Sequence, residues 1–86
     1  MIGGIITELV RLPGILWVKC IDTTYKSDSC GLYLKPITGT ELIEKGDMLW
    51  WQGREAYWTP KDRSRIDVII PRIGYSGRSK PDEVYK

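Results

Sequence analysis

The sequence predicts an all-β fold, a small and partly open barrel of five to six short strands with at most one short helical turn. Segments rich in β-branched and aromatic residues recur along the chain, and Gly, Pro and polar residues separate them at intervals of roughly 8–12 residues. A capped helical pattern occurs in one short segment. Many short strands with turn signals between them are typical of a small barrel or roll.

The length sets the domain organisation. A chain of 86 residues forms one small domain and buries about 60–65% of its unfolded surface. We expect this domain to span residues 1–75 and a flexible tail to span 76–86, where the apolar periodicity is lost. The first residues lack the basic and long apolar segments of a signal peptide, and no apolar run approaches the roughly 20 residues of a membrane span. We therefore expect a cytoplasmic protein that does not associate with membranes.

Two strands are expected before residue 23. Residues 5–12 form the first, although their apolar spacing also fits a short helix, and Pro13-Gly14 provides a turn. Residues 15–22 form the second. Its two faces carry Leu16, Val18 and Cys20 on one side and Ile15, Trp17, Lys19 and Ile21 on the other. Because both faces are mostly apolar, this strand is expected at the centre of a closed barrel or between two layers.

The middle of the chain combines a third strand with a helical turn. After a polar, turn-like stretch over 23–29, a strand is expected over 31–37, which Pro36 should end near Lys35 or confine to an edge. Thr38 and Glu41 have the spacing of a capping box. Leu42 and Ile43 would form the inward face of this turn, and Gly46 can close it in a left-handed conformation.

The sequence Glu44-Lys45-Gly46-Asp47 then leads into the most aromatic part of the chain. This entry into a central strand resembles that of SH3-like and OB-like barrels, which implies a small barrel of that general type.

Three of the four tryptophans lie between Asp47 and Pro60, which predicts a hairpin at this position. Residues 48–51 and 56–59 favour strands, and the polar residues 52–55 include a glycine suited to a tight turn. Strand alternation places neighbouring residues on opposite faces. We expect Trp50 and Trp58 in the core, and Trp51 and Tyr57 on the open face.

A loop and a last strand are expected after the hairpin. Residues 59–64 are polar, and residues 65–73 form a strand in which Ile66, Val68 and Ile70 share one face. Pro71 marks an edge or a bulge in this strand, because it has no N–H for a ladder.

The composition argues against an enzyme. Histidine is absent, so the residue most often used as a general base and metal ligand near neutral pH is missing. No serine-nucleophile motif or phosphate loop is present, and two cysteines cannot complete a zinc site without carboxylates. Cys20 is expected as a core residue and Cys30 at a loop edge, reduced by default, with a disulfide as the minority alternative. We expect no catalytic residue, metal or cofactor.

The residue types fit a binding protein better than an enzyme. All nine aromatic residues are Trp or Tyr, and Lys and Arg outnumber Asp and Glu by eight to five from Trp51 onward, against five to six before it. Aromatic rings with arginines hold bases and phosphates, so the expected ligand is nucleotide-type or a short single strand of nucleic acid. The candidate binding residues are Trp51, Arg54, Tyr57, Arg63, Arg72 and Tyr75. A solvated basic loop and core aromatics are the alternative interpretation.

A protein partner is the competing hypothesis. Trp, Tyr and Arg are common at the centres of protein interfaces, and aromatic residues on both faces of a small sheet predict a homo-oligomer or a self-assembling structural subunit. In its length, its lack of histidine and its single barrel, the chain also resembles small bacteriophage proteins. That likeness implies a sponge for nucleotide immune signals or an inhibitor of a host enzyme, with a phosphate-containing small ligand or a host protein as partner.

Overall fold

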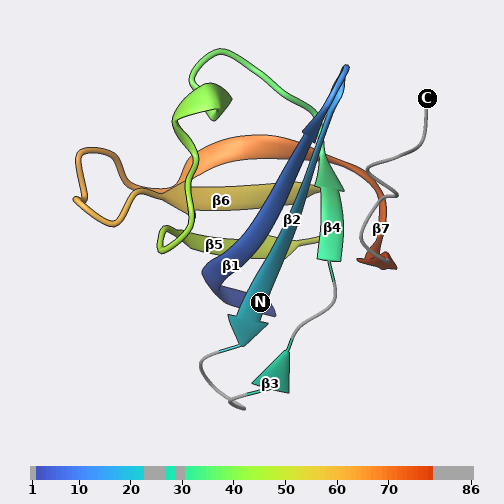
Figure 1. Cartoon of the computed structure of the whole chain (residues 1–86), viewed down its shortest axis with the longest axis horizontal. Helices are drawn as coiled ribbons and strands as arrows, with labels where there is room; N and C mark the ends of the chain where they lie inside the picture. The colour runs from blue at the N-terminus through green and yellow to red at the C-terminus, as the bar shows by residue number, and fades with distance from the viewer. Residues whose placement is uncertain (1, 23–26, 29–30, 79–86) are drawn as a thin grey trace.

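The computed structural model describes residues 2–22, 27–28 and 31–78 and confirms the all-β class. The chain folds into antiparallel strands with one turn of 3₁₀ helix (Figure 1). The elements are β1 (Ile2–Leu12), β2 (Ile15–Asp22), β3 (Ser27–Asp28), β4 (Gly31–Leu34), η1 (Thr40–Leu42), β5 (Met48–Gln52), β6 (Glu55–Thr59) and β7 (Val68–Arg78). Among the described residues, no helix has the length and apolar character needed to cross a membrane.

Six strands close into a ring. They pair in the order β1-β5-β6-β7-β4-β2, and β1 pairs with β2 as well as with β5. The two-residue β3 adds to β2. Closure depends on β1, whose residues 2–5 pair with β5 while residues 4–12 pair with β2. A bulge at Thr7 shifts the register within the β1–β2 pairing, and such bulges bend a strand as a barrel requires.

The interior of the ring holds one hydrophobic core. Its side chains come from alternate positions of each strand, as a half-buried sheet requires. The buried members are Ile6, Leu16, Val18, Cys20, Leu32, Leu34, Ile43, Leu49, Trp51, Ala56, Trp58 and Ile70. Leu16, Val18 and Cys20 share the inward face of β2, which confirms the core position expected for Cys20, whereas Cys30 lies outside the described residues.

The face prediction for the adjacent tryptophans is wrong. Trp51 is 2% exposed and belongs to the core, while Trp50 is half-buried on the outer face. The hairpin itself is confirmed, with Gln52 opposite Glu55 and a two-residue turn in which Gly53 has φ of 62°. Strand alternation predicts only that the two indoles lie on opposite faces of the sheet. The pairing of β5 with β1 and β6 decides which indole points inward.

The ends of two strands differ from the prediction. β1 begins at Ile2 rather than at residue 5, and β7 spans Val68–Arg78 rather than 65–73. Ile66 is therefore outside the strand and 72% exposed, because the chain bends through positive φ angles at Arg63 and Asp67. β7 changes partner from β6 to β4 beside Pro71, where a missing N–H is tolerated. β4 ends at Leu34, which agrees with an end near Lys35.

The helical turn forms without the expected capping box. The N-cap of η1 is Gly39, with φ of 99° and no side-chain cap, and the Thr40 hydroxyl donates to the Ile37 carbonyl at 2.8 Å. Ile43 packs inward as expected, but Leu42 is 56% exposed. The Arg11 guanidinium holds this segment against the barrel by donating to the carbonyls of residues 40, 41 and 43.

Candidate functional site

The expected binding residues do not form a single site. Arg54 lies in the hairpin turn and Tyr57 on the outer face of β6, while Arg63 lies in the β6–β7 loop at the opposite end of the hairpin. Arg72 is half-buried on β7 beside the turn, on the inward face that it shares with Ile70. Trp51 is in the core. The backbone of residue 75 belongs to β7, but the Tyr75 side chain lies outside the described part of the structure.

Apolar side chains cover part of the outside of the barrel. Trp50, Tyr57 and Ile69 are cross-strand neighbours on β5, β6 and β7, and Met48, Ile5 and Ile21 are neighbours on β5, β1 and β2. We call these six residues the outer band. Ile5, Ile21 and Ile69 are 37%, 38% and 50% exposed, and the other three members are half-buried. The outer band thus crosses five strands without a charged residue.

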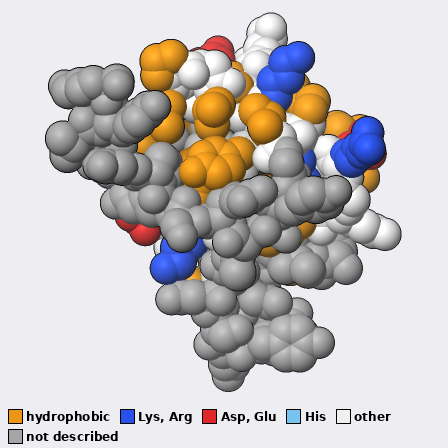
Figure 2. Space-filling model, turned by 90° about the vertical axis from the view of Figure 1, so that its right-hand side faces the viewer, with side chains coloured by type: hydrophobic (Ala, Val, Ile, Leu, Met, Phe, Trp, Pro, Cys, Tyr) orange, Lys and Arg blue, Asp and Glu red, His pale blue; other side chains and the backbone are white. Residues whose placement is uncertain are grey.

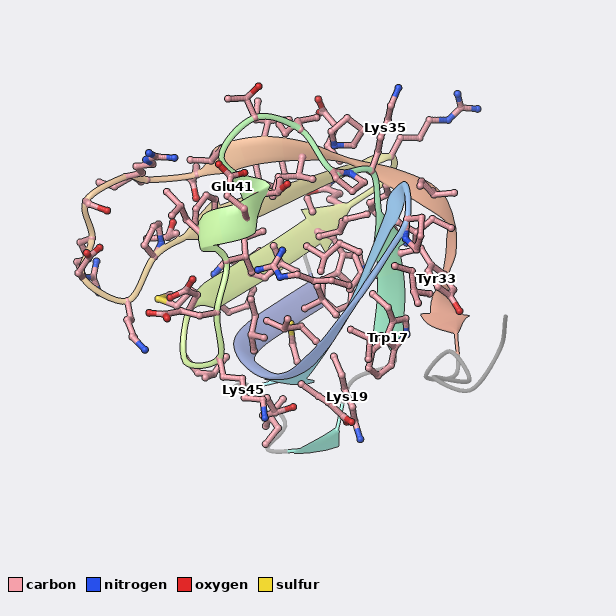
Figure 3. The ribbon with its side chains drawn as sticks, turned by 45° about the horizontal axis from the view of Figure 1, so that its top comes forward. Trp17, Lys19, Tyr33, Lys35, Glu41 and Lys45 are labelled. Carbon is pink, nitrogen blue, oxygen red and sulfur yellow. The ribbon has the colours of Figure 1, made fainter. Side chains whose placement is uncertain are left out.

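Trp50 is the one tryptophan of the four that is not buried. Trp51 and Trp58 lie in the core, and Trp17 is 2% exposed although it points away from the core. The Trp17 ring packs on the backbone of Gly31, where an added Cβ would come within 2.4 Å of Nε1. Tyr33 is its neighbour on β4, on a side of the barrel where hydrophobic side chains gather (Figures 2 and 3). Intrinsic fluorescence from an accessible indole should therefore come from Trp50.

Tyr57 has a local partner within the outer band. Its hydroxyl donates to Glu55 Oε1 at 3.3 Å. Partial burial raises the pKa of the Tyr57 hydroxyl, and the Glu55 carboxylate adds to this rise. Tyr57 therefore stays a neutral phenol at physiological pH, held at the edge of the apolar surface.

The hairpin-turn end of the barrel carries a different chemistry, because two residues of the adjoining strands have hydrogen-bond donors without acceptors. Arg72 Nη1 donates to the Gly53 carbonyl, and the backbone N–H of Arg72 donates to the Arg54 carbonyl at 2.9 Å. Arg72 Nε and Trp51 Nε1 are buried and have no hydrogen-bond partner. Desolvation lowers the pKa of the Arg72 guanidinium. No carboxylate among the described residues pairs with this guanidinium.

A cleft of about 290 Å³ opens at the other end, between the η1 segment and the β6–β7 loop. Its walls include Trp58, Pro60, Leu42 and Ser64, together with five charged residues, Glu44, Asp47, Lys61, Asp62 and Arg65. Lys61 and Glu44 form an ion pair at 3.0 Å, and the Arg65 guanidinium lies 5.9 Å from the centre of the Trp58 ring. Three carboxylates and two cations line the cleft, so it offers no excess of cations for an anion.

Asp47 is the residue at this cleft that sequence reasoning missed. Its carboxylate is 1% exposed and accepts hydrogen bonds from Trp58 Nε1 at 2.9 Å and from the backbone N–H groups of Glu44 and Lys61 at 3.1 and 3.0 Å. An aspartate three residues after Glu44 and eleven before a tryptophan has no local signature, because its partners meet only in the folded barrel.

Comparison of the chain with protein-family models, with curated proteins and with solved structures finds no match.

Proposed function

We propose that the chain is a non-enzymatic protein-interaction module that associates with a second copy of itself through the outer band. The observation that carries this proposal is the row of six apolar side chains, without a charge, on the outside of a closed barrel. The solvent-facing side of an antiparallel sheet normally carries polar residues. A contiguous apolar surface on a small domain is typical of an interaction site.

The composition of the outer band suits the centre of a protein interface. Interface cores are depleted of charged residues and enriched in Trp, Tyr and Met, which here are Trp50, Tyr57 and Met48. Two sheet faces pack about 10 Å apart through interdigitating side chains of this kind. A two-fold dimer needs one surface that complements itself, and the six side chains of the outer band carry no charge that would meet its own copy.

The geometry favours a protein over a nucleotide at this particular surface. The cleft of about 290 Å³ and a second hollow of about 330 Å³ around Arg11 contain no residue of the outer band. A base stacked on Trp50 would also lack the phosphate contacts that such recognition uses, because Arg63 and Arg72 lie at opposite ends of the hairpin. Binding of a protein partner requires neither a pocket nor a cation on the surface.

Sedimentation over a range of protein concentrations tests the proposal, together with acrylamide quenching of tryptophan emission. We expect a monomer–dimer equilibrium in which association shields Trp50 from quenching. Ile69→Lys places a charge in the outer band and should weaken dimerisation about tenfold or more, since charges in interface cores are disfavoured. Ile73→Lys is the matched control, because it changes an isoleucine of the same strand, 39% exposed, that lies outside the outer band.

Two results would contradict this function. One is a protein that stays monomeric up to about 1 mM, the concentration at which even a millimolar complex would be half formed. The other is quenching of Trp50 emission by mononucleotides or short oligonucleotides, because this would assign the outer band to a base-stacking ligand.

A nucleotide-type ligand is the second candidate function, and a separate observation favours it. The two unpaired donors of Trp51 and Arg72 lie beside the hairpin turn rather than on the outer band. Sequestration of a nucleotide signal, as the likeness to small phage proteins implies, would use that end of the barrel.

A further inference from the structure

We infer that the hairpin-turn end of the barrel contains a binding site for a phosphate oxyanion, formed by Trp51 Nε1, the Nε edge of Arg72 and the exposed Arg54. This site goes beyond the outer band and does not depend on self-association. Its starting point is a pair of buried N–H groups that have no acceptor. Buried donors in native proteins are almost always paired, so two of them at the same end of the barrel indicate a missing acceptor.

The strand register brings the two donors to the same end of the barrel. Trp51 pairs with Ala56, and Ala56 pairs with Ile70, all on the inward face. Arg72 follows two residues later on that face, next to the turn. Two strand spacings and two residue rises separate the Cα atoms of Trp51 and Arg72 by about 12 Å. Ala56, whose side chain is small, lies between them in the ladder.

The hydrogen bonds of Arg72 leave the Nε edge of its guanidinium for a ligand. Arg72 Nη1 is used by the Gly53 carbonyl, and no acceptor is found for Nε. The Nε and Nη2 groups form the side of a guanidinium that binds a phosphate or carboxylate through two parallel hydrogen bonds. The carbonyl of Gly53 fixes the plane of the guanidinium, which orients this edge before any ligand binds.

The charge at this end selects an anion. Arg72 has no carboxylate partner among the described residues, and a partly buried cation is costly unless it is compensated. Arg54 adjoins it in the two-residue turn and is exposed, so it can contact the outer side of a bound group. Neutral acceptors would satisfy the hydrogen bonds but would leave both positive charges without a counterion among the residues that the structure describes.

A small ligand or the terminal phosphate of a larger one fits these donors best. Both Trp51 Nε1 and Arg72 Nε are shielded from solvent, so we expect a larger ligand to reach them only through a small terminal group. Free phosphate and the phosphate of a nucleotide share this chemistry. The two sources differ in the base and sugar, which would lie outside the buried donors.

The test observes both N–H groups directly by ¹H–¹⁵N spectroscopy of indole and arginine side chains. Inorganic phosphate, a mononucleotide and a cyclic dinucleotide are titrated separately, with sodium chloride at matched ionic strength. We expect the Trp51 and Arg72 signals to shift together along one binding curve, while the Trp58 signal stays in place because Asp47 already accepts its N–H. Tighter binding of a nucleotide than of phosphate would identify the nucleotide as the ligand.

Variants connect the signals to the site. Arg72→Lys keeps the charge but removes the two-donor edge, and Trp51→Phe removes one donor while it retains an aromatic ring. Each should weaken binding about tenfold or more, as loss of a hydrogen bond to a charged group does. Arg63→Lys, at the opposite end of the hairpin, is the matched control and should bind as the unmodified protein does.

Three results would overturn the inference. The first is the absence of any shift at about 10 mM ligand, where even a millimolar site would be mostly occupied. The second is equal weakening by Arg63→Lys and Arg72→Lys, which would indicate diffuse charge attraction. The third is a crystal structure in which an ordered water bridges the two donors and stays in place at saturating phosphate. The wild-type titration gives a result even if a variant does not fold.

Discussion

At the scale of single residues, Asp47 connects three parts of the chain. Its Oδ2 accepts the N–H groups of Trp58 and Glu44, and its Oδ1 accepts the backbone N–H of Lys61. These donors belong to β6, to the segment that leads into β5 and to the start of the β6–β7 loop. One buried carboxylate therefore fixes the loop that forms the wall of the cleft.

Replacing this carboxylate should be among the most damaging changes to the protein. Asp47→Ala leaves three donors without an acceptor, and we expect it to lower the free energy of unfolding by about 3–5 kcal/mol, since each buried donor left unpaired costs about 1–3 kcal/mol. Asp47→Asn should cost less, because its amide oxygen still accepts hydrogen bonds. Urea denaturation followed by fluorescence measures both values.

Asp62→Ala is the control for this prediction. Asp62 also accepts a backbone N–H, from Ser64 at 2.9 Å, but it is exposed to solvent. Water can replace an exposed acceptor, so the loss should stay below about 1 kcal/mol. Similar losses for the two alanine variants would show that burial of Asp47 is not what makes it important.

At the scale of elements, Gly3 of β1 differs from the turn glycine Gly14 in what an added Cβ would contact. Gly3 has φ of 142° within a strand, and an added Cβ would lie 2.1 Å from the Leu49 carbonyl oxygen. Its neighbour across the ladder is Trp50. The close approach of β1 to β5 at this point closes the ring, so it requires a residue without a side chain.

Gly3→Ala should therefore disrupt the β1–β5 pairing. We expect a loss of about 3 kcal/mol or more, because the clash with Leu49 adds to the backbone strain. Gly14→Ala is the matched control: Gly14 has φ of 72° but nothing within 4 Å of an added Cβ, so only the strain of about 1–2 kcal/mol applies. Chemical denaturation gives the energies, and hydrogen exchange of the residue 2–5 amides locates the damage. Equal losses for the two variants would exclude the clash as the cause.

The local sequence pattern is sufficient to predict the bounds of some strands and insufficient for others. Residues 15–22 and the hairpin alternate cleanly between strong turn signals, and both have the predicted bounds to within a residue. The ends of β1 and β7 were missed because Gly3, Gly4 and Gly74 indicate turns locally, whereas pairing across the ring keeps them in strands. The capping box is wrong because η1 begins one residue later than expected, with Gly39 as its N-cap, whose N–H donates to Glu41 Oε2.

At the scale of the whole molecule, the closed ring separates residues that are near in sequence. The sequence placed six binding residues in one group, but the barrel puts Arg63 at one end and Arg54 with Arg72 at the other. Which indole faces outward depended on the strand order, which no local pattern contains. The outer band also cannot be recognised from the sequence, because its six residues come from five strands and become neighbours only when these strands pair.

Closure of the ring also determines the chemistry of Cys20, which lies in the core and is 0% exposed. Desolvation raises the pKa of its thiol to about 12, from an ordinary value of 9.0. The unfolded chain therefore loses this proton near pH 9, whereas the folded protein keeps it to about pH 12. A state that holds its proton more tightly loses relative stability as the pH rises, so the contribution of Cys20 is present below pH 9 and declines above it.

The expected decline is at most about 1.4 kcal/mol per pH unit between about pH 9 and 12. Cys20→Ala lacks this titration, so we expect the stability advantage of the wild-type protein over this variant to shrink from pH 8 to pH 11 in urea denaturation. Tyrosines, lysines and Cys30 titrate in both proteins and cancel in the difference. A gap that stays constant over this range would mean that water reaches the thiol, and hence that the ring of strands opens far enough to hydrate its core.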